Sequence, residues 1–106
     1  MASPTRRYAR AFAEVIAEHK VPPDTMVAEL EQMAALVEGS HELGNVLGNP
    51  AVEHDQKIAL LDAIIARTGA NRLLRNLVAV LIDHKRINHI GEIAAQFKQE
   101  LDERMG

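Results

Sequence analysis

LLRNLVAVLI, at residues 73–82, is the most apolar stretch of the chain. When its residues are placed at the 100° steps of an α-helix, the apolar side chains cover an arc of about 160°. Charged residues occupy the opposite side. We therefore expect an amphipathic helix over residues 70–85 and, because it is so apolar, we expect it to be the central helix of the fold. The side chains of the arc are Leu73, Leu74, Leu77, Val78, Val80 and Leu81.

A second broad apolar arc is found near the N-terminus, in a helix predicted to run to about Lys20. Ser3 is the expected N-cap, and Pro4 suits the first helical position. The sequence VPP that follows Lys20 cannot continue the helix. On the same 100° steps the apolar side chains, among them Ala11 and Val15, cover roughly 200°. In both this helix and the one over residues 70–85, the apolar arc is wider than the roughly 100° that a helix needs to face the core.

Four more helices are predicted from caps, glycines and apolar residues at three- and four-residue steps. No strand alternation or hairpin dipeptide interrupts this pattern, and aromatic residues make up only 3% of the chain. The sequence therefore predicts an all-α fold, a compact six-helix bundle forming a single domain over residues 1–106. The four segments begin at Asp24 or Thr25 and end at Gly39, run from Ser40 to Gly48, run from about residue 54 to Gly69, and run from a break at residues 86–88 to Gly106.

Composition removes several classes of function. The chain has no cysteine, so thiolate chemistry, zinc knuckles and iron–sulfur clusters have no ligands, and a reducing compartment is compatible. Its formal charge of −3 argues against a broad phosphate-binding surface. No apolar run approaches the ~20 residues of a membrane span, and the N-terminus lacks the apolar core of a signal peptide. We expect a cytosolic or peripheral protein without direct insertion into the membrane.

No motif predicts catalysis, a cofactor or a metal. The five histidines lack the spacing of HExxH and have no CxxC partner. Ser3 and Ser40 stand at expected helix N-caps, outside any GxSxG sequence. Neither GxxxxGK[ST] nor GxGxxG is present, so a nucleotide would lack its usual backbone cradle. We therefore expect no catalytic residue, no bound cofactor and no metal site.

The excess apolar width has two interpretations, which the residues alone leave open. Both helices could be central and covered by the other four. Alternatively, part of each arc could line an exposed groove that binds an amphipathic helix of a partner through apolar anchors. A separate basic concentration between Arg67 and Arg86 keeps a small helical nucleic-acid-binding regulator as an alternative function.

Three segments in order along the chain resemble the N-terminal domain of the F-type ATP synthase delta subunit, whose mitochondrial counterpart is the oligomycin sensitivity conferral protein. They are RYARAF at residues 7–12, SHELGNVLGNP at residues 40–50 and NLVAVLIDHKRI at residues 76–87. The resemblance implies a six-helix bundle that sits on the catalytic hexamer. It also implies a groove between the first and fifth helices that binds the N-terminal helix of an alpha subunit.

The family resemblance also implies which residues line this groove. Carried over by position, Tyr8 and Ala11 match groove residues of the first helix, and Asn76 and Val80 match groove residues of the fifth. Val15, from the apolar arc of the first helix, completes the expected partner-binding set. The implied role is that of a non-catalytic stator subunit, which holds the catalytic hexamer to the peripheral stalk while the rotor turns.

The chain departs from the family pattern at two points. The family's second domain, through which the b subunit of the peripheral stalk would be bound, has no counterpart here, so the expectation is a fragment or a short relative. His84 and Lys85 stand where the family often has an Asn–Gly turn after the fifth helix. The expected location is peripheral, at the cytoplasmic face of the bacterial plasma membrane.

Overall fold

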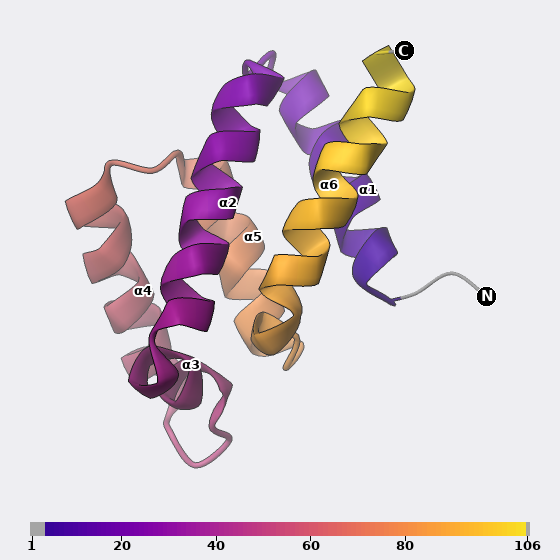
Figure 1. Ribbon diagram of the computed structural model, residues 1–106. Helices are drawn as coiled ribbons and strands as arrows, with labels where there is room; N and C mark the ends of the chain where they lie inside the picture. Colours follow the sequence, from indigo (N-terminus) through magenta and orange to yellow (C-terminus); the bar gives the residue numbers. More distant parts are fainter. Residues whose placement is uncertain (1–3, 106) are drawn as a thin grey trace.

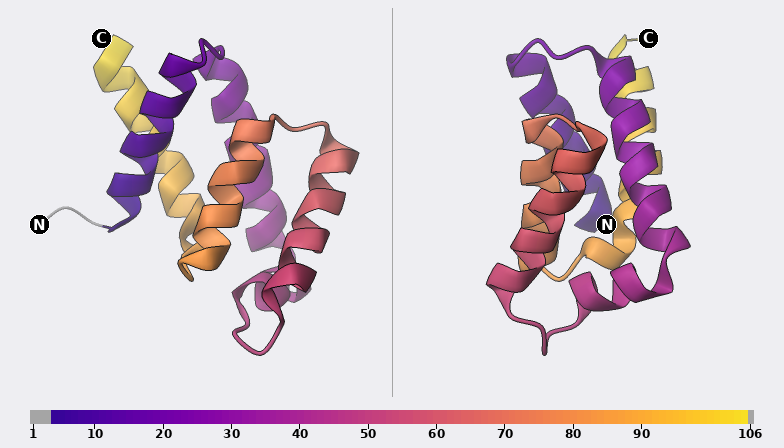
Figure 2. Two further views of the ribbon diagram at one scale, coloured as in Figure 1. Left: turned by 180° about the vertical axis from the view of Figure 1, so that it is seen from behind. Right: turned by 90° about the vertical axis from the view of Figure 1, so that its left-hand side faces the viewer.

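The computed structural model describes residues 4–105, which form six α-helices and one short 3-10 helix (Figures 1 and 2). The all-α prediction is confirmed. The predictions for Ser3 and Gly106 lie outside the described residues. The elements are α1 (Pro4–Glu18), α2 (Pro23–Gly39), α3 (His41–Gly48), α4 (His54–Thr68), α5 (Arg72–Asp83), η1 (Ile87–His89) and α6 (Ile90–Met105).

The central helix of the bundle is α6 rather than α5. One long side of α6 packs against α1 and another against α2, and α1 and α6 lie side by side in Figure 1. The rings of Phe12 in α1 and Phe97 in α6 meet at a centroid distance of 5.0 Å. By contrast α5 packs mainly against α4, with smaller contacts to α1, α2 and η1. The expectation for residues 70–85 was wrong because apolar width does not by itself distinguish side chains in the core from side chains on an exposed apolar surface.

The helix boundaries follow local chemistry, with two corrections. We expected Asp24 or Thr25 to cap α2, but the helix begins at Pro23 with Pro22 as its N-cap, since proline loses no hydrogen bond in the first turn. Helix α5 is shorter than expected because Asn71 caps it, its side chain accepting a 2.8 Å hydrogen bond from the backbone N–H of Leu73. Ser40 caps α3 in the same way, as predicted.

Helices α1 and α5 end in the same hydrogen-bonded turn. In each turn, the backbone N–H of the second residue after the C-cap donates a hydrogen bond to the carbonyl oxygen five residues earlier. Val21 donates to Ile16 after α1, and Arg86 donates to Leu81 after α5. This Schellman arrangement requires a left-handed residue, usually glycine, just after the cap. Here Lys20 and Lys85 take that place, with φ of 56° and 58°. The turn after α5 thus has a left-handed residue, Lys85, at the position where the resemblance implied the glycine of an Asn–Gly turn.

The described helices include none that is both long enough and apolar enough to cross a bilayer. Within residues 4–105, no group of three or more histidine, aspartate and glutamate side chains is arranged to hold a metal ion.

Candidate functional site: a groove between α1 and α5

An open hollow of about 430 Å³ lies between α1 and α5. All five residues expected to bind a partner line it: Tyr8, Ala11 and Val15 from α1, and Asn76 and Val80 from α5. The buried side chains of Phe12 and Leu77 form part of its lining as well. We call this hollow the α1/α5 groove.

The groove residues remain accessible. Val80 is 40% exposed, one of few large apolar side chains so exposed among the described residues. Ala11 and Asn76 are also exposed, and Tyr8 and Val15 are half-buried. Each broad apolar arc is therefore divided. One part enters the core, as Phe12 and Leu77 do, and the other part faces the groove.

The two walls are supported by different neighbours. Helix α1 rests on α6 and helix α5 rests on α4, while α1 and α5 touch each other only lightly. A 2.8 Å hydrogen bond between the Tyr8 hydroxyl and Nδ1 of His84 joins the two walls directly. The two rings are tilted by 56° at a centroid distance of 5.9 Å. A groove held between two separately packed helices exists before any partner arrives.

One end of the groove is basic. It opens into a second hollow of about 680 Å³, which shares Tyr8, Ala11 and Val80 with the first. Four potential cations line this end, and Glu14 is the carboxylate among its lining residues. The sequence did not predict this feature, because its members come from opposite ends of the chain. The four are Arg7, Arg10, His84 and Arg86.

An ion pair on the outer side of α5 supports the same wall. The Arg75 guanidinium donates to both carboxylate oxygens of Asp62 in α4, at 2.8 and 3.2 Å. These hydrogen bonds hold the pKa of Asp62 below its ordinary value of 3.8. Arg75 also donates to the side-chain oxygen of Asn76, at 3.5 Å, so the pair reaches the edge of the groove.

The fold and the groove together define a class: an all-helical domain that presents an open, largely apolar cleft between two helices, without a metal cluster among the described residues. The comparison with known families is specific. Residues 5–106 match the family described as ATP synthase delta (OSCP) subunit, and the chain belongs to this family.

Individual relatives agree with this assignment. The chain is 42% identical over its whole length to the ATP synthase subunit delta of Koribacter versatilis, of which it covers 59%. It is 34% identical over its whole length to the ATP synthase subunit delta of Acidobacterium capsulatum, again covering 59%. Over 95% of the chain it is 37% identical to the subunit delta of Desulforamulus reducens, covering 55%. The chain therefore spans little more than half of these relatives. No solved structure matches it significantly.

Proposed function

We propose that this chain is the hexamer-binding domain of a stator subunit of the F-type ATP synthase. In this role the α1/α5 groove receives the amphipathic N-terminal helix of an alpha subunit and fastens the catalytic hexamer to the peripheral stalk. The observation that carries the proposal is the gathering of Tyr8, Ala11, Val15, Asn76 and Val80 around one accessible groove. Membership of the ATP synthase delta (OSCP) family also supports it.

The energetics of such binding favour a groove that is already formed. Four apolar anchors contribute roughly 6 to 12 kcal/mol at about 1.5 to 3 kcal/mol each. Association costs roughly 4 to 15 kcal/mol, and ordering a loose groove adds to that cost. Because α1 and α5 are seated on the buried faces of α6 and α4, little of the binding energy is spent on assembling the walls.

The remaining parts of the proposal follow the family. The domain acts by mechanical attachment and not by catalysis, and it carries no cofactor. It forms a single N-terminal-type unit, and the b subunit of the peripheral stalk would be bound through a second domain outside these 106 residues. The proposed location is the cytoplasmic face of the bacterial plasma membrane, as a peripheral component.

The basic end of the groove is the reason to test nucleic-acid binding as a competing function. Arg7, Arg10 and Arg86 could contact nucleic-acid phosphates, although the net charge of −3 opposes an extended contact. The same cations suit acidic residues at one end of a partner helix. A synthetic alpha-subunit N-terminal peptide and a DNA duplex, each titrated over a salt series, separate the two functions. Steeply salt-dependent DNA binding without peptide binding would overturn the stator proposal.

Val80→Asp tests the groove itself. A carboxylate placed among the apolar anchors should weaken peptide binding at least tenfold, equivalent to about 1.4 kcal/mol. The fold should persist because Val80 is already 40% exposed. Leu36→Asp is the matched control, since Leu36 in α2 is 41% exposed and lies outside the groove. Isothermal titration gives the affinities and circular dichroism melting checks the fold. Equal affinities of the two variants would remove the groove from the binding site.

A further inference from the structure

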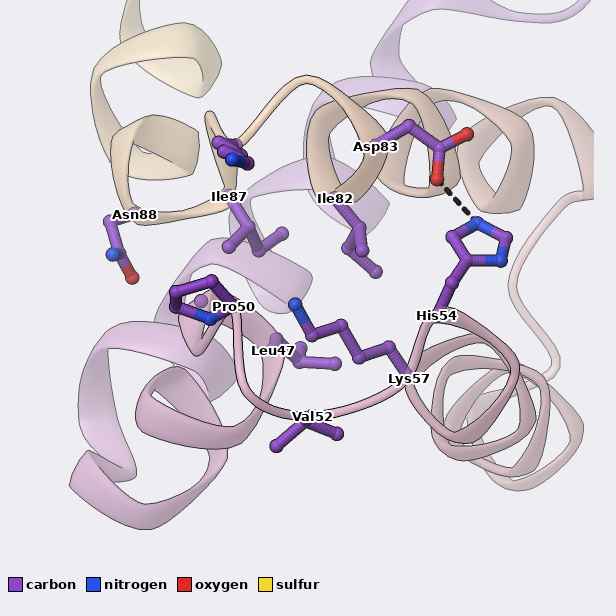
Figure 3. Close-up of a pocket in the computed structure, with 11 residues that line it drawn as sticks. Leu47, Pro50, Val52, His54, Lys57, Ile82, Asp83, Ile87 and Asn88 are labelled. Atoms are coloured by element: carbon purple, nitrogen blue, oxygen red, sulfur yellow. Dashed lines mark hydrogen bonds and ion pairs between the residues drawn. The ribbon is translucent and has the colours of Figure 1, made fainter.

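A separate pocket of about 440 Å³ lies away from the α1/α5 groove. It shares no lining residue with the groove or with the hollow at the basic end of the groove. It is enclosed by the end of α3, the loop that follows, the first turns of α4, the end of α5 and η1 (Figure 3). Leu47, Val52, Ile82 and Ile87 give it apolar walls. Nothing in the proposed stator function uses this pocket.

A buried lysine points into the pocket. Lys57 in α4 is only 9% exposed, and Figure 3 shows its side chain running from α4 so that the amino group lies among Pro50, Ile82 and Ile87. Within residues 4–105 its Nζ makes no hydrogen bond or ion pair. It is not completely sealed either, because the described chain has no fully buried side-chain nitrogen or oxygen without a partner. The ammonium is therefore reachable from the pocket.

The carboxylate within the pocket lining is already engaged. Asp83, at the end of α5, is paired with Nε2 of His54, as Figure 3 shows. The remaining charges of the lining are Lys57 and the exposed Lys85. The pocket thus holds two lysines against one carboxylate that a histidine occupies. Among the described residues the Lys57 ammonium thus has no partner, and an incoming anion can accept a charge-assisted hydrogen bond from it.

We propose that this pocket binds a carboxylate carried on an apolar group, with a carboxylate oxygen accepting a charge-assisted hydrogen bond from Lys57 Nζ. The chemistry of the lining selects this class. A phosphate is usually held by several donors or by arginine. The described residues of this lining include no arginine, and their one buried ammonium lies beside aliphatic side chains, which suits an apolar group that carries a single carboxylate. Such a carboxylate can come from a glutamate or aspartate side chain of a partner protein or from a small aliphatic acid.

The test uses two probes that represent these sources. One is hexanoate, with the neutral hexan-1-ol as its comparison. The other is a blocked pentapeptide with one glutamate between two leucines, compared with the same peptide carrying glutamine. Each is titrated into the isotopically labelled chain, and the backbone amides of Val52, Ile87 and Asn88 are followed by NMR. We expect saturable shifts for at least one carboxylate and none for its neutral counterpart.

Substitutions identify the group responsible. Lys57→Met keeps the aliphatic stem and should weaken carboxylate binding at least tenfold, while Lys98→Met, the same change at an exposed site in α6, should leave it unaltered. Asp83→Asn removes the negative charge of the lining that repels an incoming carboxylate, and it should tighten binding several-fold. Binding of hexanoate alone assigns the site to a small acid, and binding of the peptide alone assigns it to a partner protein.

The opposite results are equally clear. Absence of saturable shifts with both carboxylates overturns the proposal, as does undiminished binding to a folded Lys57→Met variant. If Lys57→Met does not fold, the charged and neutral probes on the unaltered chain and on Asp83→Asn decide. Equal binding of charged and neutral probes then assigns Lys57 to packing alone.

Discussion

At the scale of single residues, Lys20 and Lys85 hold the two groove helices at their ends in a conformation that glycine adopts more easily. A non-glycine residue in the left-handed region costs roughly 1–2 kcal/mol. Glycine avoids this strain, but it loses roughly 0.4–1 kcal/mol through the greater freedom of the unfolded chain. Since the strain outweighs the loss from chain freedom, both sites are suboptimal in the folded protein.

Lys85→Gly and Lys20→Gly should therefore each raise the free energy of unfolding by roughly 0.5–1 kcal/mol, the difference between these two effects. Urea unfolding followed by circular dichroism measures the change. Lys98→Gly, within α6, is the control and should lower stability by about 1 kcal/mol, the usual cost of glycine inside a helix. A destabilised Lys85→Gly variant would mean that the lysine side chain itself supports the turn.

At the scale of helices, the Asp62–Arg75 pair joins α4 to α5 and adds a pH dependence. The pKa of Asp62 is lowered in the folded chain, so its contribution is present above the unfolded value near 3.8 and is lost as the pH falls through the folded value. The pair lies at the surface, with the Asp62 side chain 53% exposed, so the effect is small and screened by salt.

Asp62→Asn should accordingly melt slightly below the unaltered chain at pH 6 in low salt, and the gap should close as the pH falls below the folded pKa of Asp62. Melting curves from pH 6 to pH 2.5, at low and high salt, measure this. Asp102→Asn removes another exposed carboxylate, on α6, and serves as the comparison. A gap that is independent of pH would contradict the pairing.

The sequence predicted helices more reliably than it predicted their arrangement. Caps and breakers act locally, so Ser40 and Gly69 end or begin elements where expected. The helical periodicity of apolar residues also predicted the broad apolar arcs of α1 and α5. It could not predict which side chains of each arc enter the core and which stay at the surface, because that depends on helices distant in the chain. The basic end of the groove was missed for the same reason: Arg7 and Arg86 meet only once α1 and α5 are placed.

At the scale of the whole molecule, Phe97 is the largest of the completely buried side chains, and its ring meets Phe12 under the α1 wall. Phe97→Ala should lower the free energy of unfolding by roughly 3–5 kcal/mol, since it leaves a cavity at the centre of the bundle. A domain of this kind has only about 5–15 kcal/mol in total. Calorimetry should show a single cooperative transition at a much lower temperature. A loss below about 1 kcal/mol, small beside the usual cost of such a cavity, would place Phe97 outside the main core.

The light contact between α1 and α5 has a consequence for how this domain can evolve. Because each wall is carried by a different neighbouring helix, α6 under α1 and α4 beside α5, the width of the cleft is an outcome of how the entire bundle packs. A conservative change deep beneath one wall, at a site no ligand ever touches, can shift the spacing of the anchors and alter how long a partner stays bound. Residence time in the assembly is thereby open to selection at interior positions as well as along the rim.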